Sequence, residues 1–277
     1  AWGDEPFFIA CGIIRPHVPF YAPRRFFEQY PKDGLKFDPV PTDDWDDIPE
    51  LASFSRYKAF KMEIGVNEPK KRAHWMQGYH AGVSFADELV GRILKSLEEN
   101  GLADDTIVVL FSDHGYTIGE HFMYGKVNMW EEVLRVPFAI RAPGVTQAGS
   151  KANGLIELVD IYPTLCELTG LPKPRALEGV SLVPMLRGEK DARGKNTAYT
   201  VVSRYPGEKP TSRVLGRSIR SGMWRYTEWG PEREQELYDL KNDPEQYTNL
   251  ARKPQFGDRL KRLGKLLHRR SRRSGDF

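Results

Sequence analysis

The apolar residues of this 277-residue chain fall into short uninterrupted runs and one long periodic stretch. Residues 107–111 (IVVLF) and 136–140 (VPFAI) are continuous apolar runs, which are typical of strands buried on both faces. Residues 6–14 (PFFIACGII) show the same pattern and predict a third buried strand, also parallel. Residues 68–100 carry apolar side chains at three- and four-residue spacing, which predicts a long amphipathic helix. The strand–helix–strand order indicates an α/β layered sheet.

The rest of the chain predicts a loop-rich insertion and a small second domain. Residues 21–66 are rich in Pro, Asp and aromatics without a sustained period, so we interpret the aspartates at 43, 44, 46 and 47 as solvated surface charge. Residues 159–168 predict a short helix. Four strand-like pieces then predict an antiparallel sheet: 198–203, 214–220, 223–229 and 236–240. A last helix is expected over 256–268. A shift in composition at 190–196 divides the chain into predicted domains 1–195 and 196–277.

Composition describes an ordinary globular protein and excludes several classes. The chain is 40% hydrophobic and 29% charged. Its formal net charge of +3 is too small to imply a nucleic-acid partner. No apolar run approaches the roughly 18 residues needed to span a bilayer. Two cysteines, Cys11 and Cys166, define no disulfide framework, and both are interpreted as core residues. The basic run 269–273 is either a patch for polyanions or a frayed, solvated terminus.

Candidate chemistry gathers where the predicted strands end. Asp113 and His114 follow the 107–111 run after one residue, Ser112, and ligands in open α/β sheets bind beyond the carboxyl ends of the strands. A carboxylate and a neutral imidazole can bind a divalent cation. Lys126 offers a cation for an anionic group, and His17, between two prolines, can donate a proton. This set suggests hydrolysis of an anionic ester. An ordinary turn at Asp113 and a capping role for His17 remain open alternatives.

Several segments, in order along nearly the whole chain, are similar to signatures of one family. They are 15–20 (RPHVPF), 112–115 (SDHG), 119–121 (GEH), Lys126, 135–137 (RVP), 160–165 (DIYPTL) and 236–250 (ELYDL…DP…NL). Together they resemble the C-terminal metal-and-substrate portion of the type I sulfatases. The segments SIR at 218–220 and WRYTEW at 224–229 resemble the iduronate-2-sulfatase branch of that family.

The resemblance implies a fold and a site. The fold would be a mixed, largely parallel sheet sandwiched by helices, of the alkaline-phosphatase-like type, with a small antiparallel C-terminal subdomain. Asp113 and His114 would ligate calcium, although magnesium stays open. His17 and Lys126 would contact the sulfate and act in catalysis, with His17 assisting the leaving oxygen. His121 and Arg135 would also bind the substrate, a sulfated sugar or glycosaminoglycan. The family usually works outside the cytoplasm or in lysosomes.

The chain departs from the family pattern at the nucleophile. In the family a formylglycine, made from the cysteine of a Cys-x-Pro-x-Arg motif, attacks the sulfur. Cys11 and Arg15 have that spacing without the central proline, and Cys166 has no arginine at the required offset. We therefore expect the formylglycine and the rest of the calcium site to come from an N-terminal half, present as a separate chain or missing segment. The chain alone is expected to be inactive.

Two alternatives to a sulfatase stay open. A phosphate or phosphonate ester hydrolase of the same superfamily would use similar metal and anion ligands, with a threonine or serine as nucleophile. A non-catalytic fragment would bind sulfated glycans through its basic surface.

Overall fold

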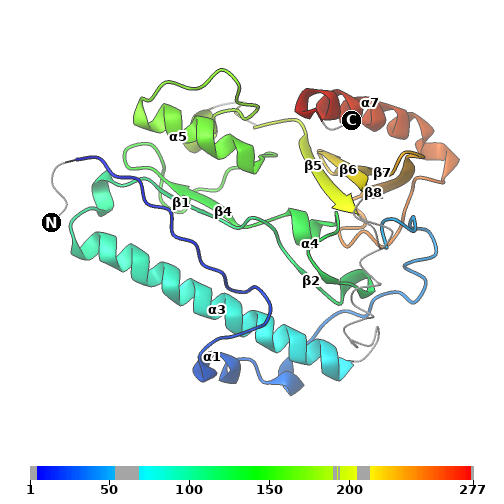
Figure 1. Ribbon diagram of the computed structural model, residues 1–277, viewed down its shortest axis with the longest axis horizontal. Coiled ribbons are helices and arrows are strands. Elements are labelled where there is room, and N and C mark those ends of the chain that lie inside the picture. The colour runs from blue at the N-terminus through cyan, green and yellow to red at the C-terminus, as the bar shows by residue number, and fades with distance from the viewer. Residues whose placement is uncertain (1–4, 54–68, 190–191, 193, 205–212, 276–277) are drawn as a thin grey trace. The chain divides into compact units, whose positions relative to one another are not determined.

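The structure of the chain is a computed structural model in which the residues form two compact units (Figure 1). The residues that it describes are 5–53, 69–189, 192, 194–204 and 213–275. The smaller unit comprises Ala1–Asp38 and Asn67–Asp105, and the larger comprises Pro39–Val66 and Thr106–Phe277. The predicted domain boundary near residue 195 lies inside the larger unit and stays a prediction.

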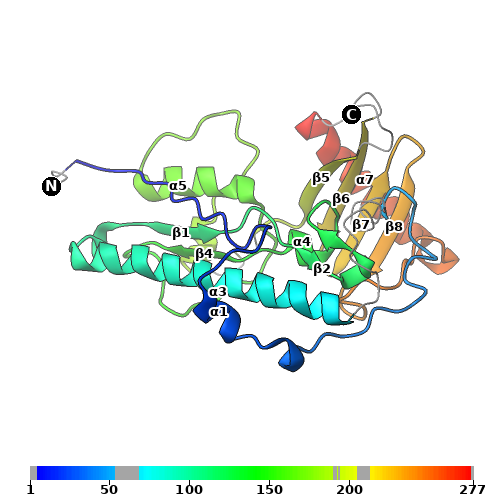
Figure 2. The same ribbon diagram turned by 60° about the horizontal axis from the view of Figure 1, so that its bottom comes forward.

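The smaller unit is built on one long helix, α3, which spans Pro69–Glu99 and confirms the amphipathic helix expected there. The short elements around it are α1 (Arg24–Glu28), η1 (Lys32–Gly34) and η2 (Ala103–Asp105). The segment that precedes α1 runs along α3 (Figure 2). Its Phe20 ring meets Trp75 of the helix edge-on, with 5.3 Å between ring centroids. This segment is therefore held by aromatic packing on α3.

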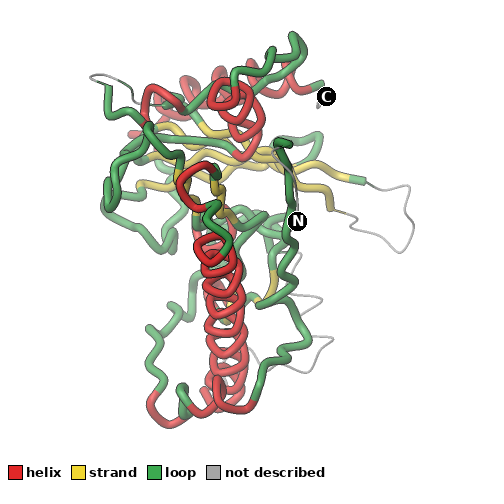
Figure 3. Tube along the Cα trace, turned by 90° about the vertical axis from the view of Figure 1, so that its left-hand side faces the viewer, coloured by secondary structure: helices red, strands yellow, loops and turns green. Residues whose placement is uncertain are grey.

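The strand predicted over residues 6–14 is wrong. These residues are an extended loop (Figure 3), and Phe8 and Ile14 are 84% and 77% exposed. An apolar run becomes a strand only where a neighbouring backbone pairs with it, and no described residue forms that ladder. Cys11 is likewise exposed, so its interpretation as a core residue is also wrong.

The larger unit begins with two paired strands, β1 (Val108–Phe111) and β4 (Phe138–Arg141). Both strands were predicted, but they pair antiparallel, with Phe111 opposite Phe138, so the parallel pairing expected for them is wrong. β1 is half-exposed rather than buried on both faces. The intervening segment contains only short elements and no crossover helix, and such a return joins strands antiparallel. Those elements are β2 (Thr117–Ile118), η3 (Glu120–Phe122), β3 (Tyr124–Gly125) and α4 (Glu131–Leu134).

Three short helices follow β4: η4 (Leu158–Asp160), α5 (Ile161–Thr169) and α6 (Val183–Leu186). α5 confirms the helix predicted at 159–168. A reciprocal capping box between Glu157 and Asp160 starts this helical segment, and Asp160 is fully buried. Cys166 is buried on α5, as the sequence predicted.

The C-terminal part confirms the predicted antiparallel sheet. Its strands, in spatial order, are β5 (Ala198–Arg204), β6 (Val214–Ser221), β7 (Trp224–Trp229) and β8 (Glu234–Asp239). After η5 (Pro254–Phe256), the last helix, α7, spans Gly257–Ser274. It is longer than predicted, so the basic residues 269–273 are helical rather than frayed.

The four-stranded sheet has a separate apolar core on each face. On one face, Ile219, Tyr226 and Leu237 pack against Leu263 and Leu267 of α7, which lies across the strands in Figure 1. On the other face, the core is formed by Ile48, Ala52, Met123, Met129, Trp130, Trp229, Tyr238 and Leu240. The alternation of side chains along each strand directs successive residues to the two cores. The sheet therefore separates α7 from the loop that contains Met123 and Met129.

Two glycines of α3 should respond oppositely to substitution by alanine. A Cβ at Gly78 would lie 2.7 Å from the Phe20 ring, whereas a Cβ at Gly91 would meet nothing within 4 Å. We expect Gly78→Ala to lower the free energy of unfolding by about 1–3 kcal/mol through overpacking. Gly91→Ala should raise it by up to about 1 kcal/mol, because alanine favours the helix. Denaturant titration of both variants measures this, and equal effects would contradict the packing of Phe20 on α3.

Candidate functional site

The candidate site is centred on the turn that follows β1. Asp113 and His114 are the first polar pair beyond Phe111, and the Asp113 side chain is 80% exposed. The backbone N–H of His114 donates to Asp113 Oδ1 at 3.0 Å. The Ser112 hydroxyl donates to the carbonyl of His114 at 2.8 Å. These local hydrogen bonds fix the carboxylate and the imidazole relative to each other.

The protonation of His114 follows from its backbone partner. Its Nδ1 lies 2.8 Å from the carbonyl oxygen of Gly115. Because a carbonyl oxygen can only accept, Nδ1 donates a hydrogen there, and Nε2 is the nitrogen left to bind a metal through its lone pair. Metal-binding histidines commonly have this arrangement, in which the second ring nitrogen donates to a backbone carbonyl.

The two free ligand atoms are spaced to share a cation. His114 Nε2 and Asp113 Oδ2 are 3.5 Å apart, which is too long for a strong hydrogen bond. Two ligands that each lie about 2.4 Å from one calcium ion, at a right angle, are about 3.4 Å apart. The donor set therefore fits a divalent cation as two ligands of a larger shell. Within the described ranges there is no group of three or more His, Cys, Asp or Glu residues that could hold a metal.

A close backbone approach at Gly115 holds this turn in place. Gly115 N–H donates to the Val133 carbonyl at 2.7 Å, and Tyr116 N–H donates to the Glu132 carbonyl at 3.1 Å. A Cβ at position 115 would lie 1.9 Å from that Glu132 oxygen. Only glycine fits there, because any side chain would break the docking of the turn onto α4.

Lys126 lies just after β3 and is half-buried. No hydrogen bond or ion pair to the described residues occupies its ammonium group. A half-buried lysine without a carboxylate partner is available for an anionic ligand.

His121, whose predicted role in substrate binding stays a prediction, is fully buried. Its Nδ1 lies 3.1 Å from Asp44 Oδ2, and its ring stacks on Trp130 with centroids 4.0 Å apart. The Trp45 indole N–H donates to its carbonyl at 2.7 Å. These contacts favour a supporting role, in which His121 anchors the loop that continues to Lys126.

The partner of His121 corrects the interpretation of the aspartates at 43–47 as surface charge. Asp44 was interpreted as solvated surface charge, but it is only 3% exposed. Asp47 is half-buried, and burial raises the pKa of its carboxyl group above the ordinary value. No local pattern predicts this burial, because His121, which contacts the Asp44 carboxylate, lies 77 positions away.

Arg135 belongs to a cluster of arginines around a single carboxylate. Its side chain is exposed at the end of α4. Arg220 and Arg225 both pair with Glu131. Burial lowers the pKa of Arg220, Glu131 opposes that shift, and Arg225 and Arg135 lower the pKa further. The cluster thus has more positive than negative charge.

Arg220 and Arg225 received no functional role from the sequence. A sequence feature could have indicated such a role, because both arginines fall in the segments at 218–220 and 224–229 that resemble one sulfatase branch. Spacing alone could not connect them with Arg135, since β6, β7 and α4 meet only in the fold.

His17 lies in the smaller unit, whereas the other candidate residues lie in the larger one. Its side chain is exposed, and its Nδ1 donates to the Val18 carbonyl, which leaves Nε2 free. Arg15 donates to the carbonyls of His17 and Pro19 at 2.8 and 3.0 Å and so braces the loop. The role of His17 stays a prediction.

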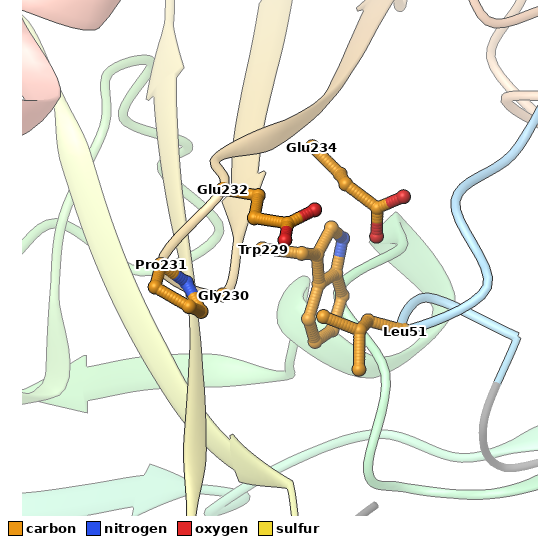
Figure 4. A pocket seen from close by; sticks show the side chains of 6 residues that line it. All are labelled: Leu51, Trp229, Gly230, Pro231, Glu232 and Glu234. Carbon is orange, nitrogen blue, oxygen red and sulfur yellow. The ribbon is translucent and has the colours of Figure 1, made fainter.

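A separate hollow in the larger unit is a poor candidate for an anionic ligand. Leu51, Trp229, Gly230, Pro231, Glu232 and Glu234 line it (Figure 4). The two glutamates are exposed and add negative charge without a cation among the lining residues. Charge repulsion therefore excludes it as a sulfate or phosphate site.

Comparison with protein families places the chain among the sulfatases. The family model described as Sulfatase matches residues 2–171. A second model, described as N-sulphoglucosamine sulphohydrolase, C-terminal, matches residues 119–273. These matches cover both the Asp113–His114 turn and the C-terminal sheet.

Individual relatives point the same way. A sulfatase of Formosa agariphila is 33% identical over 95% of this chain and 50% of its own length. A Delta 4,5-hexuronate-2-O-sulfatase of Bacteroides thetaiotaomicron is 30% identical over 89% of this chain and 51% of its own length. The chain thus spans about half the length of the curated relatives that it matches.

The fold resembles that of a phosphonate monoester hydrolase from Silicibacter pomeroyi. The TM-score is 0.82 at 24% identity, over 94% of this chain and 54% of the other. The predicted α/β class of the alkaline-phosphatase-like type, with a small antiparallel sheet, is confirmed.

Glu132, whose carbonyl supports the Gly115 turn, should make stability depend on pH. Burial raises the pKa of its carboxyl group above the ordinary 4.5. A raised pKa in the folded state means that stability is fully present below about pH 4.5 and falls as the pH rises through the folded-state pKa. We expect Glu132→Gln to flatten this fall in denaturant titrations between pH 4 and about pH 8. Glu167→Gln, at an exposed position of α5, is the matched control. Identical profiles for the wild type and Glu132→Gln would contradict the prediction.

Proposed function

Because the chain belongs to the sulfatase family, we propose that it contributes metal and sulfate ligands to a sulfuric ester hydrolase that acts on sulfated sugars. The observation that carries this proposal is the pair of free ligand atoms, His114 Nε2 and Asp113 Oδ2, held 3.5 Å apart. Lys126 of the same unit, which has no ion-pair partner among the described residues, adds the cation that an anionic ester requires.

In this proposal Asp113 and His114 hold a calcium ion, with the remaining ligands supplied by the N-terminal half. When bound, the ion would offset negative charge on the sulfate oxygens. Lys126 binds a sulfate oxygen as a point charge, and that contact strengthens as charge develops in the transition state. His17 protonates the sugar oxygen as its bond to sulfur breaks, so that a neutral alcohol leaves. The free Nε2 of His17 supports this assignment.

The attacking group would come from outside these residues. The chain has no Cys-x-Pro-x-Arg motif. We propose that a formylglycine in the N-terminal half supplies the nucleophilic oxygen. The N-terminal half is therefore the partner on which activity depends.

We propose a uronate 2-O-sulfate as the substrate. The name of one relative, a hexuronate-2-O-sulfatase, supports this choice. The excess positive charge of Arg135, Arg220 and Arg225 would attract the carboxylate of a uronate as well as its sulfate. A phosphonate ester is the second candidate, but the structural likeness that suggests it supports the fold alone.

We further propose that the enzyme works outside the cytoplasm or in a lysosome, where sulfated glycans are processed. Among the described residues no helix is long and apolar enough to cross a membrane.

Substitution of the site residues in the full-length polypeptide tests the proposed function. Lys126→Ala should lower kcat/KM for a 2-O-sulfated uronate by about 10²–10³, because a charge contact to the developing anion is lost. It should leave calcium affinity unchanged. Asp113→Asn should weaken both calcium binding, followed by calorimetry, and turnover. Lys151→Ala is the control, at an exposed loop position.

Three outcomes would each contradict a part of the proposal, and the first two concern activity. One is sulfatase activity of these 277 residues alone, because they contain no nucleophile motif. The other is faster turnover of phosphonate than of sulfate monoesters by the full-length enzyme, which would favour the second candidate. Calcium binding that survives Asp113→Asn would remove the metal assignment.

A further inference from the structure

We propose that the outward face of α7 is a binding surface for sulfated polysaccharide chains, separate from the candidate site. The choice of a sulfated polysaccharide rests on the proposed function. The surface itself, called here the α7 surface, is defined by the helix's exposed cations. These are Lys261, Arg262, Lys265, Arg269, Arg272 and Arg273.

The charge of this region differs from that of the chain as a whole. Residues 252–273 contain ten of the chain's 41 lysines and arginines and a single acid, Asp258, whereas the whole chain carries a formal net charge of only +3. The rest of the chain is therefore net negative. A solvated helix face that served only solubility would carry mixed signs, as α3 does with Glu98 and Glu99 beside Lys95.

The exposed cations of α7 are not neutralised by acidic side chains among the described residues, and Arg272 donates only to the carbonyl of His268. Among the described residues, none of the six forms an ion pair. By contrast, Arg270, on the inner side of the same helix, has a carboxylate partner. Arg270 donates from Nη2 to both carboxylate oxygens of Glu157, each at 3.1 Å. The inward charge of Arg270 is thus neutralised by Glu157, whereas the outward cations remain available to an anionic ligand.

The helix is anchored firmly enough to act as a rigid array. Leu263 and Leu267 are fully buried against the sheet, and His268 Nε2 lies 2.8 Å from Glu228 Oε2. Lys261, Lys265 and Arg269 are four residues apart and therefore lie along one side of the helix. A row of cations at one-turn spacing, about 5–6 Å apart, suits a linear polymer with repeated sulfate groups.

The α7 surface lies across the sheet from the loop that carries Lys126. Ile219, Tyr226 and Leu237 face α7, whereas Trp229 and Tyr238 face the core that contains Met123 and Met129. Binding at α7 would therefore hold a polymer without occupying the ester-hydrolysing site. It would raise the local concentration of sulfate esters for that site.

The test is binding of the full-length protein to heparin at several NaCl concentrations. The variant is the triple substitution Lys261→Gln, Lys265→Gln and Arg269→Gln, which keeps good helix formers on an exposed face. The control is Lys70→Gln, Arg92→Gln and Lys95→Gln, which removes the same charge from exposed positions of α3. We expect the α7 triple variant to bind at least tenfold more weakly. The magnitude of the slope of log affinity against log salt should fall by about two, because each of the three lost charge contacts would release about 0.7 fewer counterions.

Binding and turnover are measured separately, so the two proposals can fail independently. Turnover of a small sulfate monoester should be the same in the α7 triple variant and the wild type. If neither protein turns the ester over, that result would count against the proposed function alone. Equal weakening by the α3 control, or no weakening by the α7 triple variant, would overturn the α7 surface. Equally tight binding of duplex DNA would also overturn it, since the occupant would then be any polyanion.

Discussion

The arrangement of the candidate site depends on one close approach between backbones, that of Gly115 to the carbonyl of Glu132. The two peptide hydrogen bonds to α4 can form only because position 115 lacks a Cβ, which would lie 1.9 Å from that oxygen. This contact fixes the end of the turn. The bond from His114 Nδ1 to Gly115 then fixes the ring, so that Nε2 faces the Asp113 carboxylate. This candidate ligand pair on an exposed turn thus obtains its geometry from the backbone and needs no buried side chain.

A buried polar contact supports the loop on the other side of the site. His121 and Asp44 are both withdrawn from water, a step that costs free energy unless the groups are paired. Their contact, together with the stacking of His121 on Trp130, offsets that cost. It joins the loop before Lys126 to the segment around residue 44. The position of Lys126 therefore depends on the buried contact between His121 and Asp44.

The sequence predicted the elements whose hydrogen bonds are local and missed those that depend on distant partners. α3 and the hairpins of the C-terminal sheet follow from periodicity and turn residues alone. Residues 6–14 have the composition of a strand but no neighbouring strand among the described residues, so the strand predicted from composition does not form. Strand ends and family motifs predict Asp113, His114 and Lys126 as site residues. The sequence does not predict the burial of Asp44 or the grouping of Arg220 with Arg135, because both arise from contacts between segments far apart in the chain.

Two sets of cations in the larger unit differ in burial and in their partners. Arg225 and Arg270 are buried or nearly so and have carboxylate partners, since an unpaired charge is costly away from water. Lys126 and the cations of the α7 surface retain solvent and have no acidic partner among the described residues. A solvated cation can exchange water for an anionic ligand without breaking a structural ion pair. Anion binding at Lys126 and at the α7 surface would therefore not break these structural ion pairs, and substitutions there can leave folding stability largely unchanged.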